Sequence, residues 1–326
     1  MIPLNRPLIV VLGATGAEGG GLARALLEHH RYAVRAITRH PGSPRAQALQ
    51  EAGAELMAAD LDDAAALSVA FTGAHGVYAV TSQREHGSPE RELRQATAIA
   101  EAARRAGVRH VIWSTAEDTR RCVPLHDPRL PTLDGQWKVP VFDAKGAADA
   151  VFDELELPLT RLYTSFPWES LLHDGLHPQR DADGTLVLTL PLGGVALPGI
   201  AAEDIGRCAA AVFERGTWTI GRTIGLAGEH LTATEMAATL ATALGEPVRA
   251  EEPSRGEYAS RGVPPRAATW ANLFGFVQLC NARVRAARPV EDTRALHPGA
   301  LDFAGWLARH AHRLPIAPRR AAIAQT

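Results

Sequence analysis

The sequence has very little lysine. Its 34 basic side chains include only two lysines, Lys138 and Lys145, and the rest are arginine, set against 36 acidic side chains. The formal net charge of −2 argues against a protein that coats nucleic acid or an anionic membrane surface. Abundant alanine beside the arginine is typical of a GC-rich coding sequence. That bias accounts for the general scarcity of lysine, but not for the two positions that keep it.

Cysteine and long apolar runs are also scarce. Cys122, Cys208 and Cys280 lie far apart with no CxxC spacing, so we expect neither a disulfide framework nor a zinc site. No run of eighteen apolar residues is present, which predicts no membrane-spanning helix. The opening MIPLNRPLIVVLG runs directly into a strand pattern and does not resemble a signal peptide. We therefore expect a soluble, cytoplasmic protein.

Residues 8–163 alternate between short β-branched runs and longer Ala-rich amphipathic stretches. The predicted strands are 8–12, 33–38, 55–58, 76–81, 110–114 and 159–163. The predicted helices between them are 17–29, 43–52, 63–71, 90–106 and 143–155. Such alternation indicates an α/β fold, a doubly wound Rossmann parallel sheet with helices on both faces.

The alternation weakens after residue 163. A hairpin closing on Asp183-Gly184 is predicted over 181–190, and helices over 203–214, 232–244, 266–278 and 299–312. We expect a Rossmann domain over 1–163, completed by later segments, and a smaller, mostly helical α/β lobe over 164–312. Residues 313–326 are predicted to be a disordered tail, and 122–138 a long surface loop.

A glycine-rich turn follows the first strand and opens the next helix. Gly13, Gly16 and Gly19 stand in a strand–turn–helix context, where glycines allow a pyrophosphate to approach the backbone and the helix N-terminus faces the phosphates. This context predicts a dinucleotide site.

The end of the second strand indicates which dinucleotide binds. NAD-binding proteins usually place an acid there, but no acid lies between His29 and Gln50, and Arg39 stands at the strand end. An arginine can bind a 2′-phosphate, which favours NADP(H) over NAD(H), although a plain solvated arginine is the alternative. Asp60, after the third strand, could bond the adenine amine or cap the helix over 62–71.

One of the two lysines stands where local electrostatics disfavour it. Asp143 is predicted to cap a helix, which places Lys145 in the first turn, where the helix dipole disfavours a cation. A lysine kept at such a position indicates a need for a compact ammonium group. Lys138 is interpreted as a surface lysine without a role.

Several segments together resemble the NmrA-like family of atypical short-chain dehydrogenases/reductases, in particular its NmrA-like family domain-containing type. They are the glycine turn, ITRHP, AGAELMAADLDD, HVIWSTAED, VFDAKG and LTATEMAATLATALG, and the resemblance extends to about residue 310. It implies that an NADP(H) site is formed by Gly13, Thr15, Gly16, Ala17, Glu18, Gly19, Arg39, His40, Asp60, Leu61, Thr81, Ser82, Gln83, Arg94, Lys145, Pro167, Trp168, Glu169 and Ser170. Within this set Lys145 would bond the nicotinamide ribose and is the catalytic candidate, and 167–170 would line the nicotinamide.

The sequence departs from catalytic short-chain dehydrogenases at one position. The tyrosine expected four residues before the lysine is Val141, so the usual proton relay cannot form. Ser114 and Thr115 lie near the place of the partner serine. Substitute proton donors would be Tyr163, His126 or Lys145 itself. The family's Asn after Phe-Glu is replaced by Ser170, and its Arg-Leu-Pro by Tyr-Thr-Ser at 163–165, so the nicotinamide wall would differ in detail.

Two functions follow from these residues. The favoured hypothesis is a redox sensor, in which NADP(H) occupancy shifts the conformation read by a regulatory protein partner. The alternative is an NADPH-dependent oxidoreductase that reduces quinone, azo or enone acceptors needing little acid catalysis. A DNA-binding repressor is disfavoured because neither a basic patch nor a helix-turn-helix signature is present. The histidine pairs lack ligand spacing for a metal, and the oligomeric state is left open, a homodimer included.

Overall fold

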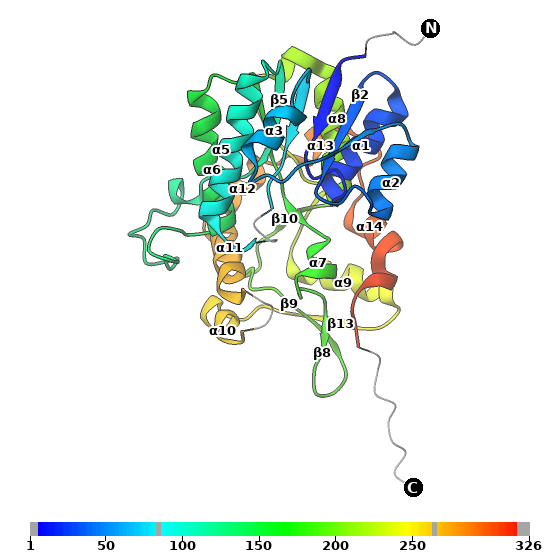
Figure 1. Cartoon of the computed structure of the whole chain (residues 1–326). Helices are drawn as coiled ribbons and strands as arrows, with labels where there is room; N and C mark the ends of the chain where they lie inside the picture. The colour runs from blue at the N-terminus through cyan, green and yellow to red at the C-terminus, as the bar shows by residue number, and fades with distance from the viewer. Residues whose placement is uncertain (1–5, 83–85, 263–265, 318–326) are drawn as a thin grey trace.

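The computed structural model describes residues 6–82, 86–262 and 266–317. At its centre is a seven-stranded parallel sheet in the order β11-β6-β5-β4-β1-β2-β3 (Figure 1). The strands are β1 (Leu8–Val11), β2 (Ala33–Thr38), β3 (Glu55–Ala58), β4 (Gly76–Ala79), β5 (His110–Thr115), β6 (Leu159–Tyr163) and β11 (Thr223–Gly225). The first six confirm the predicted strands, and the seventh arrives from late in the chain.

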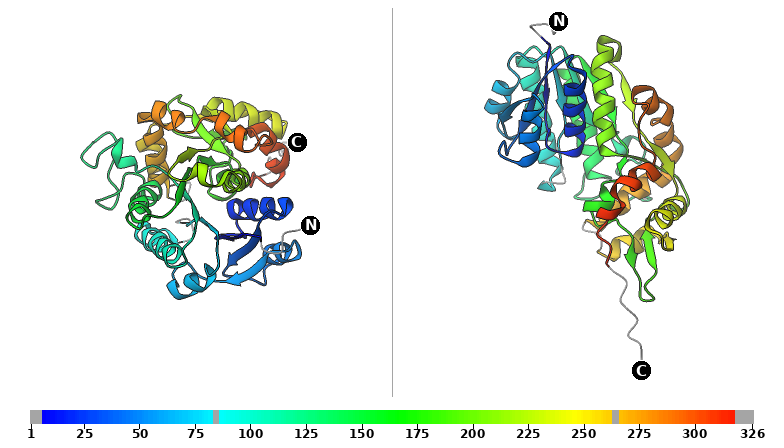
Figure 2. Two further views of the ribbon diagram at one scale, coloured as in Figure 1. Left: turned by 90° about the horizontal axis from the view of Figure 1, so that it is seen from above. Right: turned by 90° about the vertical axis from the view of Figure 1, so that its right-hand side faces the viewer.

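Helices cover both faces of this sheet (Figure 2). One face packs against α1 (Ala17–His29), α2 (Pro44–Glu51), α8 (Ala202–Arg215) and α13 (Val290–Leu296). The other packs against α3 (Ala64–Ala70), α5 (Pro89–Arg105) and α6 (Pro140–Glu154). Because β1, β4 and β5 are buried on both faces, they read as continuous apolar or small-residue runs. The doubly wound Rossmann fold is confirmed.

Two glycines allow α1 and α8 to pack with their backbones in close contact. A Cβ on Gly206 of α8 would lie 2.2 Å from the Glu18 carbonyl oxygen and 2.3 Å from the Leu22 nitrogen. A Cβ on Gly21 of α1 would lie 2.4 Å from the Glu203 carbonyl oxygen. Side chains larger than hydrogen are excluded from both positions, so α8 is held directly against the helix that follows the glycine turn.

The smaller lobe contains more strand than the sequence indicated. Helices α7 (Ser170–His173), α9 (Ala233–Leu244), α10 (Arg255–Ser260), α11 (Ala267–Leu279), α12 (Asn281–Ala286) and α14 (Phe303–His310) surround two three-stranded sheets. One sheet is β12 (Glu229–Leu231), β10 (Leu197–Ile200) and β7 (Phe166–Pro167). The other is β13 (Val248–Glu251), β9 (Leu186–Thr189) and β8 (Gln179–Arg180). The predicted hairpin is the antiparallel pair β8–β9, with Gly184 in the turn.

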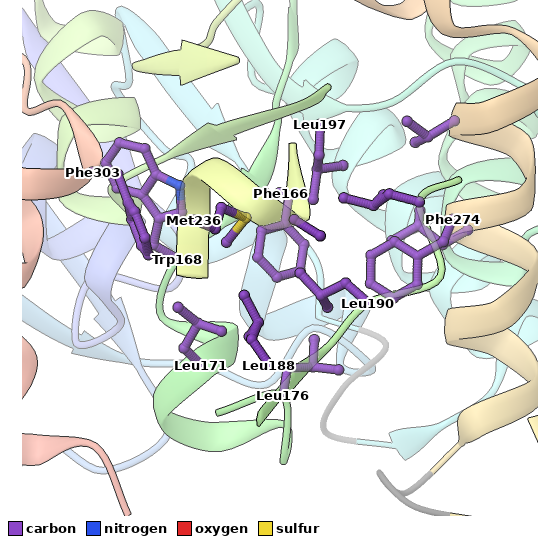
Figure 3. Close-up of a cluster of buried hydrophobic side chains, with 14 of the residues drawn as sticks. Phe166, Trp168, Leu171, Leu176, Leu188, Leu190, Leu197, Met236, Phe274 and Phe303 are labelled. Atoms are coloured by element: carbon purple, nitrogen blue, oxygen red, sulfur yellow. The ribbon is translucent and has the colours of Figure 1, made fainter. Parts of the chain in front are cut away.

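Leucines and aromatic side chains form the core of this lobe (Figure 3). Trp168, Phe303 and Trp306 pack against one another with ring centroids 5.4–6.2 Å apart. Residues Val123, Leu130 and Val139 join this core, so the segment that connects β5 to α6 packs against the smaller lobe. The predicted surface loop over 122–138 is therefore largely anchored by buried side chains.

The expectation that the cysteines form no disulfide is wrong. Cys122, in the β5–α6 connection, is bonded to Cys280, between α11 and α12, across a sequence separation of 158 residues. Cys208 is buried and free. The spacing of the cysteines in the sequence could not reveal this pair, because the two cysteines meet only through packing of distant elements. The bond ties the connection after β5 to the smaller lobe.

The interpretation of Lys138 as a surface lysine is also wrong. Its side chain is buried, and Nζ donates to the backbone carbonyls of Asp127, at 2.9 Å, and Leu130. Burial lowers the pKa of Lys138. The lysine therefore stabilises its own loop by binding two of the loop's carbonyl groups.

The end of the described chain lies against the smaller lobe. Ile316 packs on its core, and Arg180 Nε donates to the Ala317 carbonyl at 2.9 Å. The remainder of the predicted tail, 318–326, falls outside the described residues. No helix in the described ranges is both long and apolar enough to cross a membrane.

Candidate functional site

The strand order places the predicted residues along one edge of the sheet. In the order β3-β2-β1-β4-β5-β6 the direction of winding reverses between β1 and β4. Parallel strands end at a common edge, and open α/β sheets bind ligands where the order reverses. The segments after β1, β2, β3, β4 and β5 therefore lie along one edge of the sheet.

The glycine turn has the shape that phosphate binding requires. Gly13 has φ +62°, and its carbonyl accepts the Gly16 N–H at 2.9 Å. A Cβ on Gly19 would lie 2.5 Å from the Gly13 carbonyl oxygen, so only glycine lets the helix pack on the turn. Gly16 is the N-cap of α1, and no side chain caps this end within the described residues. The backbone N–H groups of the first turn are thus left for an anion.

Of the other residues predicted in the turn, Ala17 and Gly16 are exposed and Glu18 is half-buried. The Glu18 carboxylate accepts the hydroxyl proton of Tyr78 in β4. Burial, together with this carboxylate, raises the pKa of Tyr78 well above its usual value. The contact connects the turn to the adjacent strand, so Glu18 stabilises the position of α1.

Two basic side chains follow β2, and a third, from α2, reaches the glycine turn. Arg39 and His40 are exposed just after β2, and Arg45 of α2 donates from Nη1 to the Thr15 carbonyl at 3.3 Å. Arg45 therefore reaches the glycine turn itself. The arrangement suits an anionic group beyond the end of β2, and it adds Arg45 to the predicted Arg39 and His40.

Asp60 does not cap the helix that follows it. The N-cap of α3 is Asp63, whose carboxylate accepts the N–H groups of Ala65 and Ala66. Asp60 accepts the Asp62 N–H at 3.0 Å in a local turn, which corrects the capping alternative and leaves its adenine role a prediction. Leu61 and Arg94 do lie together, and with Asp62, Arg91 and Ala98 they line a hollow of about 500 Å³.

Lys145 is the most tightly held polar group at this edge. Its Nζ lies 3.2 Å from Glu92 Oε1, 3.1 Å from Thr81 Oγ1 and 3.1 Å from the Ser114 carbonyl oxygen. It also lies 4.7 Å from the centre of the Trp113 ring. Thr81 Oγ1 and the Ser114 carbonyl accept hydrogen bonds from Nζ, and the contact with Glu92 is an ion pair.

The helix that carries Lys145 starts earlier than predicted. α6 begins at Pro140, so Lys145 stands in its second turn and Asp143 is not its N-cap. Asp143 instead accepts the backbone N–H groups of Lys138 and Val139 at 2.7 and 3.0 Å, and the Thr119 N–H at 2.9 Å. Although Asp143 lies within α6, its carboxylate binds N–H groups of the residues just before the helix. Proline at position N1 marks the start of the helix, and the prediction of Asp143 as the N-cap did not use this signal.

Thr81, predicted in the site, is buried and donates to Glu92 Oε1 at 2.6 Å. Ser82 is exposed next to it, whereas Gln83 lies outside the described residues.

No phenol takes the place of the missing tyrosine on α6. Val141 stands one helical turn before Lys145. The Thr115 hydroxyl donates to Asp149 at 3.1 Å, so one of the two hydroxyls near the expected position of the partner serine is bonded inside the fold. Ser114 is buried.

The residues predicted to line the nicotinamide divide into two groups. Pro167, in β7, is half-buried and pairs with Ile200. The Trp168 side chain, however, points into the core of the smaller lobe, and Ser170 is buried (Figure 3). Glu169 accepts the Ala202 N–H and the Trp306 Nε1–H, both at 3.0 Å. Because the Glu169 side chain is bonded within the core of the smaller lobe, a contact of this segment with the nicotinamide would come from its backbone.

Glu92 is the functional candidate that the sequence reading missed. It is fully buried, and in sequence it precedes Ala96, Ile99 and Ala103 on one apolar helical stripe. A carboxylate on such a stripe requires a buried partner, so the position of Glu92 in the sequence could have indicated a buried ion pair. That partner is Lys145.

Fold and site together define a protein of the Rossmann class with an appended small lobe. The family model that describes the NmrA-like family matches residues 5–296. The chain therefore belongs to the NmrA-like family.

One curated relative illustrates the degree of sequence similarity. The NmrA-like family domain-containing oxidoreductase notA of Aspergillus sp. (strain MF297-2) is 31% identical over 219 residues, which is 61% of each chain. The chain spans between 35% and 61% of the lengths of the first curated relatives that it matches.

Two solved structures share the fold over nearly the whole length. The negative transcriptional regulator NmrA, in complex with NADP, has a TM-score of 0.74 at 23% identity, covering 94% of this chain and 95% of that one. The triphenylmethane reductase of Citrobacter sp., complexed with NADP(H), has a TM-score of 0.73 at 20% identity, covering 93% and 99%.

Proposed function

We propose that this protein binds NADP(H) at the carboxyl edge of its central sheet and acts as a reductase of small molecules. The observation that carries the proposal is Lys145, held by Thr81, Glu92 and Ser114 beside the strand ends that face the glycine turn. Support also comes from the relatives named oxidoreductases and from the fold neighbours solved with NADP or NADP(H).

The residues fit the cofactor. The uncapped N-terminus of α1 and the close-packed Gly19 would take the pyrophosphate. Arg39, with His40 and Arg45 beside it, would take the 2′-phosphate, and Lys145 would bond the nicotinamide ribose. When bound, NADPH supplies a hydride to the substrate. The protein side of the chemistry is to orient the cofactor and to exclude water, since Val141 offers no acid for a substrate oxygen. Acceptors that need little acid catalysis, such as quinones, azo compounds and enones, suit this site.

Cofactor preference tests the assignment of Arg39. The Arg39→Ala variant is expected to bind NADPH about ten- to a hundredfold more weakly and NADH unchanged, because only NADPH carries the charge that the guanidinium would bond. Fluorescence titration of both cofactors measures the two constants. Arg31→Ala, an exposed arginine before the other end of β2, is the matched control. An unchanged NADPH/NADH ratio in Arg39→Ala rejects the 2′-phosphate assignment.

Turnover tests the reductase itself. Oxidation of NADPH is followed with a panel of quinones, azo dyes and enones, and Lys145→Met is expected to lower kcat/KM about a hundredfold or more. The Glu101→Gln variant, an exposed carboxylate on α5, should keep the wild-type rate. Turnover unaffected by Lys145→Met would remove the lysine from the mechanism.

A redox sensor is the second candidate, and one observation favours it. Val141 replaces the catalytic tyrosine, so occupancy without turnover is a consistent outcome. Tight NADPH binding with no turnover across the panel would favour the sensor and a regulatory protein partner over the reductase.

A further inference from the structure

The carboxylate of Glu92 is buried with only part of its bonding capacity used. Its exposed fraction is 0%, and Oε1 accepts from the Thr81 hydroxyl at 2.6 Å and lies 3.2 Å from Lys145 Nζ. Oε2 is also buried and has no hydrogen-bond partner among the described residues. An ionised carboxylate in such surroundings is costly unless a cation compensates it. The cation in contact with it is Lys145.

The free oxygen faces a histidine rather than solvent. His86 Nε2 lies 3.8 Å from Glu92 Oε2, beyond hydrogen-bond distance, and it too lacks a partner among the described residues. The Nδ1 atom of His86 accepts the Ser88 N–H at 3.1 Å, which places the proton of a neutral imidazole on Nε2. A hydrogen-bond donor, His86 Nε2, therefore lies close to Glu92 Oε2.

Apart from Glu92, the described groups that contact Lys145 are uncharged. They are Thr81, the Ser114 carbonyl and the Trp113 ring. From α6, Asp149 lies one turn after Lys145, but it is itself paired with Arg161 of β6 and bonded to Trp113 and Thr115. Among the described residues, Glu92 is thus the carboxylate in direct contact with the lysine.

We propose that Glu92 is a positioning residue, whose buried carboxylate holds Lys145 Nζ at the point from which it reaches the nicotinamide ribose. This inference rests on the proposed function. Glu92 is itself fixed by the Thr81 hydroxyl, so it sets the direction from which Nζ turns toward a ribose hydroxyl. Glu92 thereby acts on the cofactor through Lys145, without touching it.

The two lysines of this sequence allow a direct test. In protein labelled with ¹³C-lysine, the side-chain Cε signals come from Lys138 and Lys145 only, and each reports the surroundings of its own Nζ. In Glu92→Gln, the change in the Lys145 signal on addition of NADPH is expected to fall to about half or less of the wild-type change, because Nζ is no longer held by the buried carboxylate. The Lys138 signal should not move, and Glu101→Gln should keep the wild-type response of Lys145.

Cofactor binding gives the second readout. The dissociation constant of NADPH should rise about tenfold in Glu92→Gln, since a lysine without its buried carboxylate is not held in position to donate to the ribose. Glu92→Asp, which keeps the charge one methylene further away, should restore most of the wild-type affinity. If Glu92→Gln does not fold, Glu92→Asp alone should still show a smaller response of the Lys145 signal to NADPH than the wild type.

The outcomes separate the inference from the function on which it rests. A wild-type protein that fails to bind NADPH overturns the proposed function before any variant is made. A wild type that binds NADPH, with the response of the Lys145 signal and the dissociation constant both unchanged in Glu92→Gln, overturns only the role of Glu92.

Discussion

Breaking the Cys122–Cys280 disulfide is expected to lower the free energy of unfolding by about 5 kcal/mol. The bond closes a loop across a separation of 158 residues, and in the chain-entropy description the constraint on the unfolded chain grows with loop length. Denaturation by guanidinium chloride, with and without a thiol reductant, measures the difference. A midpoint that does not move on reduction would contradict the expectation.

The native fold should nevertheless persist after reduction. Arg288, which follows α12, is buried and forms a bidentate ion pair with Glu117, in the segment that contains Cys122. The same two regions are thus held together by a second contact. The Cys122→Ser/Cys280→Ser double variant is the control, and its unfolding should be insensitive to reductant. Cys208 is buried and unpaired in both forms and should contribute nothing to the difference.

Replacing Gly206 by alanine is expected to lower the free energy of unfolding by about 3 kcal/mol or more. The new Cβ would lie 2.2 Å from the Glu18 carbonyl oxygen and 2.3 Å from the Leu22 nitrogen. Both atoms are backbone, so the clash cannot be relieved by turning a side chain, and α8 must move away from α1. Because α1 begins at the glycine turn, NADPH binding should weaken in the same variant.

The matched control is Gly256→Ala. Gly256 lies in the exposed face of α10, where an added Cβ meets no atom within 4 Å. Alanine there should leave stability unchanged or raise it by up to about 1 kcal/mol, because it favours the helix. Thermal and denaturant unfolding of both variants check the pair. Equal stabilities of Gly206→Ala and Gly256→Ala would show that the two helices pack less closely than described.

Local patterns were sufficient to predict the Rossmann part of the fold. The strand β1 and the turn at Gly13 follow from an apolar run and from glycine's tolerance of positive φ, which are properties of neighbouring residues. The short strands of the smaller lobe were not predicted, because segments such as Phe166–Pro167 are too short to show any periodicity.

The candidate site was predictable only where it is local. The glycine turn and Arg39 are read from strand ends, whereas the Glu92–Lys145 ion pair joins residues on two helices that meet only in the folded chain. The Cys122–Cys280 bond and the carbonyl contacts of Lys138 depend on tertiary packing in the same way. The start of α6 was misplaced because Asp143 resembles a cap in sequence, while its carboxylate works from within the helix.

The burial of both lysines has a practical consequence for handling the protein. Lys138 is inaccessible, and the side chain of Lys145 is only 13% exposed and engaged by three neighbouring residues. Reagents that acylate amines, such as succinimidyl esters used for dyes and surface coupling, therefore find no freely exposed lysine on the native molecule. The rate at which Lys138 becomes acylated would consequently report how often its loop opens.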